Sequence, residues 1–416
     1  MPLRLFTGMV AAALLLPAEN WPGFRGPTRQ GISAETGLPT RWSAAENIAW
    51  KTPIPGLGYS SPIVWGDRVF VTTATEAGVS CRLLSLDRRS GRILWDREVL
   101  RQQTKRKQVR NSYATPTPVT DGELVYTVFS GGMAALDFQS GERRWLNNEV
   151  DHFSEHGLGA SPILHQDLLI MSYDGSSPGD SPKVGWKIPW DQAVILALDK
   201  RTGQTRWRGK RGLSRIAHVT PNVLPGASPP QLVSAAGDVI QGFDVRTGER
   251  LWSVYAQGEG VVPSVVVGDG LVYAASGVEA STIRAVKPDG RGDVTTTHVA
   301  WKQTKGVPRI PSFLYRKPCL FTITEAGIAM CLRAETGEIV WQQRVGGEHS
   351  ASPVWSDGLI YFLSDQGETT IIRAAPEYKE VARNSIGQPC QASIAISQGN
   401  LFLRSNTHLF CVGNTP

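Results

Sequence analysis

The sequence predicts an all-β protein: an eight-bladed β-propeller of four-stranded antiparallel blades, with its ring closed by an N-terminal strand that pairs with the last blade. Two repeated motifs and the composition predict this fold. Gly and Pro account for 43 and 27 of the 416 residues, and Trp for 13. Such usage is typical of many short strands joined by tight turns. Only 19 % of the residues are charged, which argues against a coiled coil.

The first repeated motif ends in tryptophan. It reads LLSLDRRSGRILW at 83–95, MAALDFQSGERRW at 133–145, ILALDKRTGQTRW at 195–207 and IQGFDVRTGERLW at 240–252. A fifth copy ends at Trp341, with Ala334 in place of the aspartate, and a sixth, stretched by an insertion, ends at Trp301. Successive tryptophans are 50, 62, 45, 49 and 40 residues apart, which suits propeller blades of about 40–50 residues with insertions.

Each part of this motif has a structural explanation. The apolar alternation before the aspartate predicts a strand, and the aspartate can accept hydrogen bonds from the amides of the following turn. The glycine supplies the positive φ that closes the hairpin. The tryptophan then lies on the outer strand, where its ring can pack against the neighbouring blade. The predicted docking tryptophans are Trp50, Trp95, Trp145, Trp207, Trp252, Trp301 and Trp341.

The second motif places a small or polar residue beside Pro or Ser, directly before an apolar strand. It occurs eight times: YSSPIVW at 59–65, YATPTPV at 113–119, GASPIL at 159–164, HVTPNVL at 218–224, VVPSVVV at 261–267, RIPSFLY at 309–315, SASPVW at 350–355 and CQASIAI at 390–396. Eight first strands predict eight blades. The last blade runs out of chain, and its missing outer strand is available at 47–51, which carries Trp50 with no blade before it. Pairing of the two segments would remove an exposed edge. Only blade seven, with 378–384 as its outer strand, lacks the tryptophan.

The Asp-x-x-(Ser/Thr)-Gly-x-x-x-Trp copies resemble the tryptophan-docking repeats of pyrroloquinoline-quinone (PQQ)-type eight-bladed propellers, over about residues 47–416. That family includes quinoprotein alcohol dehydrogenases and the propeller subunit of the outer-membrane β-barrel assembly machinery. The opening Trp21-Pro22-Gly23-Phe24-Arg25-Gly26-Pro27 is similar to the leader of exported members with no assigned activity. The resemblance implies the fold. It leaves open a protein-interaction or ligand-binding scaffold, a quinoprotein-type oxidoreductase with a degenerate PQQ site, and a carbohydrate-binding propeller.

The quinoprotein members imply a set of residues that can be compared with this chain. They carry an adjacent-cysteine disulfide over the quinone, a Trp floor, and a Ca²⁺ held by Glu, Asn and Asp beside an Asp base. This chain has no adjacent cysteines, and no calcium set can be matched to its motifs. Its seven histidines form no metal-binding spacing. We therefore expect no catalytic residues, no metal, and neither PQQ nor Ca²⁺ as a cofactor.

The segments that enter the first strands should converge on a central funnel, where a ligand or a protein partner would bind. Their hydrogen-bond donors, cations and aromatic rings suit a polar or anionic ligand. The alternative is that these loops are polar only because they are exposed to solvent. An insertion at 174–192, with Trp186 and Trp190, could cover the funnel, contact a partner or tuck into its blade. The candidate funnel residues are Tyr59, Asn111, Tyr113, His156, Arg215, His218, Glu259, Arg309, His349 and Gln391.

Residues 1–18 are typical of a secretory signal peptide, with Arg4 before an apolar run that is shorter than the ~20 residues of a membrane span. No cysteine near the cleavage region indicates a lipoprotein anchor. We expect a signal peptide at 1–18, an extension at 19–46 and the propeller at 47–416, in a periplasmic or secreted monomer without a membrane span. The formal charge of +6 is spread along the chain and predicts no nucleic-acid partner.

Export would expose the five cysteines to an oxidising compartment. Cys319 and Cys331 flank a predicted turn almost symmetrically, so in a hairpin they would face each other. They could form a disulfide or remain two free thiols.

Overall fold

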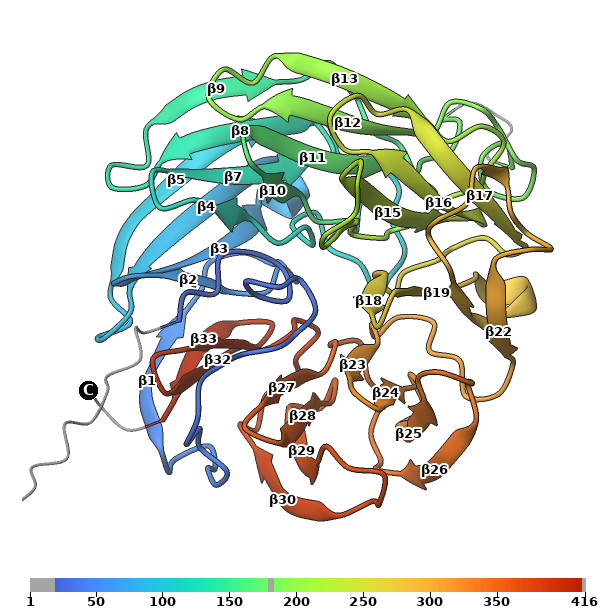
Figure 1. Cartoon of the computed structure of the whole chain (residues 1–416). Coiled ribbons are helices and arrows are strands. Elements are labelled where there is room, and N and C mark those ends of the chain that lie inside the picture. The colour runs from blue at the N-terminus through green and yellow to red at the C-terminus, as the bar shows by residue number, and fades with distance from the viewer. Residues whose placement is uncertain (1–18, 179–182, 414–416) are drawn as a thin grey trace, which may run out of the picture.

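Eight antiparallel sheets stand around a central axis, as the computed structural model shows (Figure 1). The structure describes residues 19–178 and 183–413, so the predicted signal peptide at 1–18 lies outside the described residues. The predicted fold class is confirmed: seven sheets have four strands and one has five. The two short 3-10 helices described are η1 (Glu76–Gly78) and η2 (Val278–Ala280). Among the described residues, no helix has the length and apolar character needed to cross a membrane.

The first four blades follow in chain order, from the inner strand to the outer. Blade 1 consists of β2 (Ile63–Trp65), β3 (Arg68–Thr75), β4 (Ser80–Asp87) and β5 (Ile93–Arg101). Blade 2 consists of β6 (Val119–Thr120), β7 (Leu124–Phe129), β8 (Gly132–Asp137) and β9 (Arg143–Asn147). Blade 3 consists of β10 (Ile163–His165), β11 (Leu168–Tyr173), β12 (Val194–Asp199) and β13 (Thr205–Lys210). Blade 4 consists of β14 (Asn222–Leu224), β15 (Gln231–Ala236), β16 (Asp238–Asp244) and β17 (Arg250–Ala256).

The remaining blades include one insertion and the closing strand. Blade 5 consists of β18 (Val266–Gly268), β19 (Leu271–Ala275), β20 (Ile283–Val286) and β22 (Val299–Gln303), and its insertion adds β21 (Gly292–Asp293) in parallel to β17. Blade 6 consists of β23 (Leu314–Arg316), β24 (Cys319–Ile323), β25 (Ile328–Arg333) and β26 (Ile339–Arg344). Blade 7 consists of β27 (Val354–Ser356), β28 (Leu359–Leu363), β29 (Glu368–Arg373) and β30 (Glu380–Ser385). Blade 8 consists of β31 (Ala395–Ser397), β32 (Asn400–Arg404), β33 (His408–Val412) and β1 (Ile48–Pro53).

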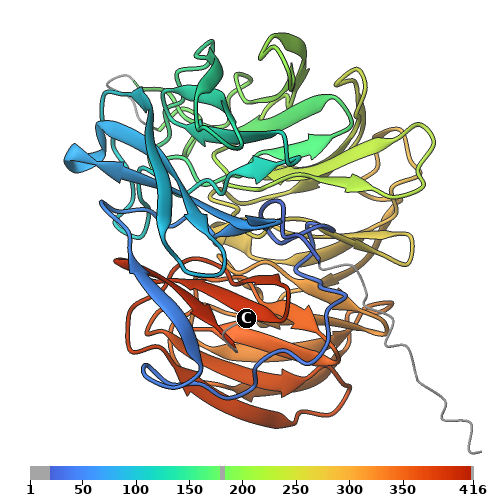
Figure 2. The same cartoon turned by 90° about the vertical axis from the view of Figure 1, so that its left-hand side faces the viewer.

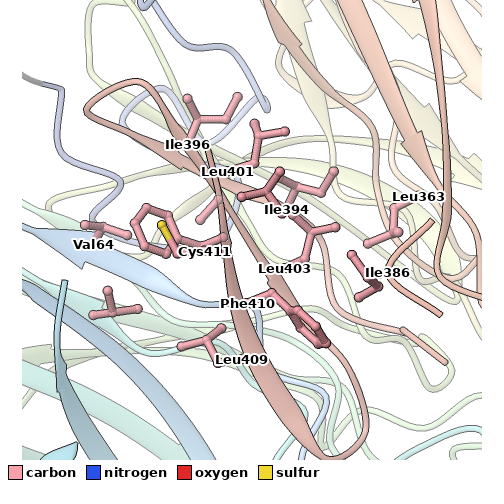
Figure 3. Close-up of a cluster of buried hydrophobic side chains, with 14 of the residues drawn as sticks. Val64, Leu363, Ile386, Ile394, Ile396, Leu401, Leu403, Leu409, Phe410 and Cys411 are labelled. Atoms are coloured by element: carbon pink, nitrogen blue, oxygen red, sulfur yellow. The ribbon is translucent and has the colours of Figure 1, made fainter. Parts of the chain in front are cut away.

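The ring closes through β1, as the sequence predicts. Strand β1 pairs antiparallel with β33, with Trp50 opposite Cys411 and Thr52 opposite Leu409. In Figure 2 the blue β1 stands beside the red strands of the last blade. Leu409, Phe410 and Cys411 belong to a buried cluster that joins blades 7, 8 and 1 (Figure 3). Six further clusters each lie between two neighbouring blades, so burial of apolar side chains holds each blade to the next.

The outer-strand tryptophans reach across to the next blade. Their indole N–H groups donate to backbone carbonyls in the following blade's outer turn: Trp50 to Arg88, Trp145 to Lys200, Trp207 to Val245, Trp301 to Ala334 and Trp341 to Ala375. Beneath most of these rings lies the turn glycine of the next blade. A Cβ on Gly91 would lie 2.5 Å from the Trp50 ring, so the close approach depends on glycine as well as on its positive φ. The indole nitrogen of Trp95 is buried without a hydrogen-bond partner in the described part of the chain.

Trp252 makes the same connection indirectly. Its indole N–H donates to Gln231 Oε1 at 2.9 Å, and Gln231 Nε2 donates to the carbonyl of Pro288 in blade 5 at 3.0 Å. Trp252 is fully buried. The insertion that carries β21 lengthens the outer turn of blade 5. Gln231 therefore bridges the Trp252 indole and the backbone of that turn.

Two details of the sequence interpretation are wrong. In blade 6 the position of the motif aspartate is held by Arg333, because the Gly337 amide bonds to the Arg333 carbonyl as the Gly91 amide bonds to that of Asp87. Ala334 is instead the residue whose carbonyl receives Trp301. The strand register also places Cys331 opposite Phe321 and Cys319 opposite Arg333, so the two cysteines are diagonal neighbours and do not face each other directly. All five cysteines are buried free thiols.

The N-terminal segment, residues 19–35, contacts the inner strand region of every blade. In each blade the contacted residue lies one to four positions further along the chain than the residue that leaves the central funnel and enters the inner strand. The segment therefore crosses the central channel at the end opposite the funnel. The contacts are Trp21 with Val64, the Pro22 carbonyl with Thr120, Arg29 with Leu164 and Asn222, Gln30 with Val267, Arg25 with Phe313, Gly31 with Trp355, and Glu19 with Ser397.

The rest of the extension compensates for the missing tryptophan of blade 7. Trp42 is buried in the cluster shared by blades 7, 8 and 1. Asn384 on β30 accepts a hydrogen bond from the Trp42 amide and donates one to the Thr40 carbonyl. A residue that is distant in sequence thus covers an outer strand that has no tryptophan of its own.

Candidate functional site: the central funnel

The central funnel is a cavity of about 550 Å³ around the propeller axis. Most of its wall comes from the segments that lead into the eight inner strands, and Phe24 in the N-terminal segment also lines it. Because the N-terminal segment contacts all eight blades beyond that point, the cavity is open to solvent at one end and obstructed at the other.

One hydroxyl from each blade lines this cavity, and in all eight blades it lies two residues before the inner strand begins. The eight residues, which we call the hydroxyl ring, are Ser61, Thr117, Ser161, Thr220, Ser264, Ser312, Ser352 and Ser393. The backbone N–H of one member donates to the hydroxyl oxygen of the member in the next blade, at 2.9 to 3.1 Å. This bond joins seven of the eight neighbouring pairs, including Ser393 to Ser61 across the closure.

Six of the ten predicted funnel residues lie in the cavity wall: Tyr59, Asn111, His156, His218, Arg309 and Gln391. His218 is nine-tenths buried, and its Nε2 has no hydrogen-bond partner within the described ranges. Burial lowers the pKa of His218 to about 3, with smaller contributions from His156 and His152, so its imidazole is neutral at physiological pH. The side-chain oxygen of Gln391 is likewise buried and unpartnered within those ranges.

The other four predicted residues lie behind the wall, each held by partners of its own. The Tyr113 hydroxyl donates to the Lys105 carbonyl. Arg215 forms a two-pronged ion pair with Asp238 and a second with Glu279. These partners keep Tyr113 and Arg215 away from the cavity.

Glu259 and His349 are satisfied in the same way. Glu259 is buried and pairs with Lys187 at 2.7 Å. The Nδ1 and Nε2 atoms of His349 lie 3.0 and 2.9 Å from the carbonyl oxygens of Leu363 and Gly346, so its ring N–H donates to backbone behind the wall. Sequence position relative to the inner strand did not distinguish such buried, paired groups from those that face the axis.

The described residues of the insertion, 174–178 and 183–192, pack against one side of the funnel. The Trp186 ring lies 5.8 Å from that of His156, edge to face, and His156 lies 5.9 Å from His218. Lys187 Nζ lies over the Trp186 ring at 4.8 Å. The described part of the insertion therefore supports the funnel wall at blades 3 and 4, and Trp186 is held there by an edge-to-face aromatic contact.

The charged groups of the wall are unequally engaged. Arg110 pairs with Glu348 at 3.2 Å. Glu325 accepts hydrogen bonds from the backbone N–H groups of Arg309 and Ile310. The guanidinium of Arg309 has no hydrogen-bond or ion-pair partner within 19–178 and 183–413, and the residue is exposed at the mouth.

These residues do not fit a calcium-bound quinone. Glu325 is the one carboxylate of the described wall, and its Oε1 already accepts hydrogen bonds from two backbone amides. No group of three His, Cys, Asp or Glu residues within the described ranges is arranged to hold a metal ion. All five cysteines are buried elsewhere.

The hydroxyl ring was missed by the sequence interpretation. Its members all belong to the second repeated motif, so the repeat itself held the signal. The motif also contains neighbouring hydroxyls such as Ser60 and Thr115. The sequence does not show which hydroxyl of each copy belongs to the ring, and the fold decides it.

Comparisons with known proteins agree with this architecture. The sequence profile of the family described as outer membrane protein assembly factor BamB matches residues 26–209, 188–295 and 279–378. BamB of Bordetella pertussis is 27 % identical over 265 residues, 60 % of this chain and 59 % of that protein. Tetrathionate hydrolase of Acidithiobacillus ferrooxidans is 28 % identical over 307 residues, 68 % of this chain and 53 % of that protein. The chain thus spans less than two thirds of the length of these relatives.

Two solved structures share the fold. BamB from Moraxella catarrhalis superposes with a TM-score of 0.58 and 17 % identity, covering 88 % of this chain and 96 % of that one. A europium-containing methanol dehydrogenase gives a TM-score of 0.69 and 11 % identity, covering 92 % of this chain and 89 % of that one. At these identities the likeness concerns the fold alone. The resemblance to PQQ-type propellers is confirmed.

Proposed function

Since this chain belongs to the outer membrane protein assembly factor BamB family, we propose that it is a non-catalytic scaffold, acting outside the cytoplasm, that holds a protein partner or a polar ligand in its central funnel. The observation that carries the proposal is the funnel itself: a cavity of about 550 Å³ with unpartnered polar groups in its wall. Ligand sites are typically concave, with a few convergent polar groups that fix orientation.

The wall offers polar groups of the kind that a binding site needs. Arg309 and the buried His218 Nε2 offer polar atoms that no described protein group uses. An unpartnered buried polar atom costs about 1–3 kcal/mol, a cost that a bound ligand can remove. A rigid ring of eight blades holds these groups in fixed positions, as a scaffold requires.

A site-specific crosslinking experiment tests this proposal. A photoreactive amino acid is placed at Arg309 in the funnel mouth or, as a matched control, at Arg201, an exposed arginine in the outer turn of blade 3. After irradiation in cells that express the protein, the Arg309 position should give a reproducible adduct that mass spectrometry identifies, and the Arg201 position should not. Adducts that are absent at Arg309, or identical at both positions, would reject a funnel partner.

A further inference from the structure

The hydroxyl ring has a direction. In the seven described links, each hydroxyl oxygen accepts a backbone N–H from the preceding blade. None of the eight hydroxyls donates its own proton to a protein group in the part of the chain that the structure describes, and all eight line the cavity. Accepting an N–H polarises a hydroxyl and strengthens its O–H as a donor. The ring therefore presents a circle of O–H donors to whatever occupies the axis.

The position of the ring limits what can reach it. Phe24 also lines the cavity, and its neighbour Arg25 donates to the Phe313 carbonyl, directly after ring member Ser312. The N-terminal segment therefore obstructs the channel close to the ring. A ligand that enters from the open mouth has to end at the ring and cannot thread through.

The charge along this path favours an anionic end. Arg25, beneath the ring, is almost completely buried, and burial lowers its pKa to about 9 with no carboxylate acting to raise it. Arg309 stands at the mouth with a guanidinium that has no partner in the described part of the chain, whereas Oε1 of Glu325 accepts hydrogen bonds from the amides of Arg309 and Ile310. Hydrogen bonds to a charged acceptor are about twice as strong as those between neutral groups.

We infer that the hydroxyl ring binds the terminal oxyanion of an elongated ligand, a carboxylate or a phosphate, whose body fills the funnel above it. This inference rests on the proposed funnel function and names the chemistry of its occupant. Two sources share that chemistry: the C-terminal carboxylate of a polypeptide and a free phosphate.

The experiment is calorimetric titration of the full-length mature protein with three probes. They are an unstructured hexapeptide with a free C-terminal carboxylate, the same peptide as its C-terminal amide, and inorganic phosphate. We expect the acid peptide to bind at least about tenfold more tightly than the amide if the source is a chain end. We expect inorganic phosphate to bind more tightly than either peptide if the source is phosphate.

Variants locate the site. Replacement of two ring hydroxyls, Thr117→Val with Thr220→Val, should lower the affinity for the probe that binds by about tenfold or more. The double variant Thr117→Ser with Thr220→Ser should restore that affinity. The matched control is Thr322→Val with Thr369→Val, which removes two buried hydroxyls on β24 and β29 that lie away from the cavity and have no partner among the described residues. Arg309→Gln should weaken binding and Arg201→Gln should not.

Equal affinity for the acid and amide peptides without competition by phosphate would overturn the inference, as would absence of binding by all three probes at about 5 mM. The comparison of peptides on the unaltered protein decides the matter even if the valine variants fail to fold. If Arg309 crosslinks to a partner but none of the three probes binds, oxyanion binding by the ring is rejected and the proposed scaffold function is retained.

Discussion

The indole nitrogen of Trp50 donates a 2.8 Å hydrogen bond to the carbonyl oxygen of Arg88. Trp50 lies on the strand that completes blade 8, and Arg88 lies in the outer turn of blade 1, so this bond joins the two ends of the ring. The same contact recurs between blades that are neighbours in sequence. At the closure it connects a blade built from both ends of the propeller to the first blade.

Trp50→Ala should lower the free energy of unfolding by about 3–5 kcal/mol, because it removes a buried aromatic ring and leaves a cavity over Gly91. Trp50→Phe keeps part of the ring and should cost less. Chemical denaturation measures both values. A loss below about 0.5 kcal/mol for the alanine variant would contradict a role for Trp50 in closing the ring.

Gln231→Ala should leave the buried Trp252 N–H without an acceptor and lower the free energy of unfolding by about 1–3 kcal/mol. Gln303→Ala is the matched control, because its amide bonds to the Gly337 carbonyl from a half-buried position and should cost less. Equal costs for the two variants, from denaturation curves, would count against the bridge.

Acid should destabilise the protein through its buried histidines. Burial lowers the pKa of His218 to about 3 and that of His152 to about 4, from a usual value of 6.5. Each histidine binds more protons when the chain is unfolded, so its contribution to stability is complete above about pH 6.5 and is lost as the pH falls toward the folded-state pKa. The loss reaches at most about 1.4 kcal/mol per pH unit for each histidine.

Denaturation midpoints measured from pH 7.5 down to 4.5 check this pH dependence. His218→Asn should reduce the slope of stability against pH in that range, whatever it does to stability at neutral pH. His298→Asn is the control, since His298 is more exposed. An unchanged slope in the His218 variant would show that this imidazole is already solvated.

Arg25→Ala should loosen the N-terminal segment under the ring. The change removes the donor that Arg25 supplies to the carbonyls of Gln30 and Phe313. Hydrogen exchange at the Trp355 amide, which bonds to the Gly31 carbonyl at 2.7 Å, should accelerate by about tenfold or more. Arg41→Ala, an exposed position in the same extension, should leave that exchange rate unchanged.

Much of the fold could be predicted from the sequence because each repeat contains its own short-range turn and strand signals. Asp87 and Gly91 close an outer turn through contacts within five residues, and the alternation before them defines the strand. Ring closure could also be predicted, because an unpaired outer strand at one end matched an incomplete blade at the other. The insertion at 174–192 could be recognised, but not the edge-to-face contact of Trp186 with His156 that holds its described part.

The sequence by itself determined the number of blades, their turns and the segments that face the axis, since these depend on short-range patterns. The tertiary structure decided which polar residues reach the cavity. Tyr59 and His349 occupy similar places in the repeat, yet only Tyr59 lines the funnel, because two backbone carbonyls hold the His349 ring behind the wall. The N-terminal segment beneath the ring also belongs to this second class. Arg25 and Phe313 are 288 residues apart, and contacts at that separation form only when the blades have closed.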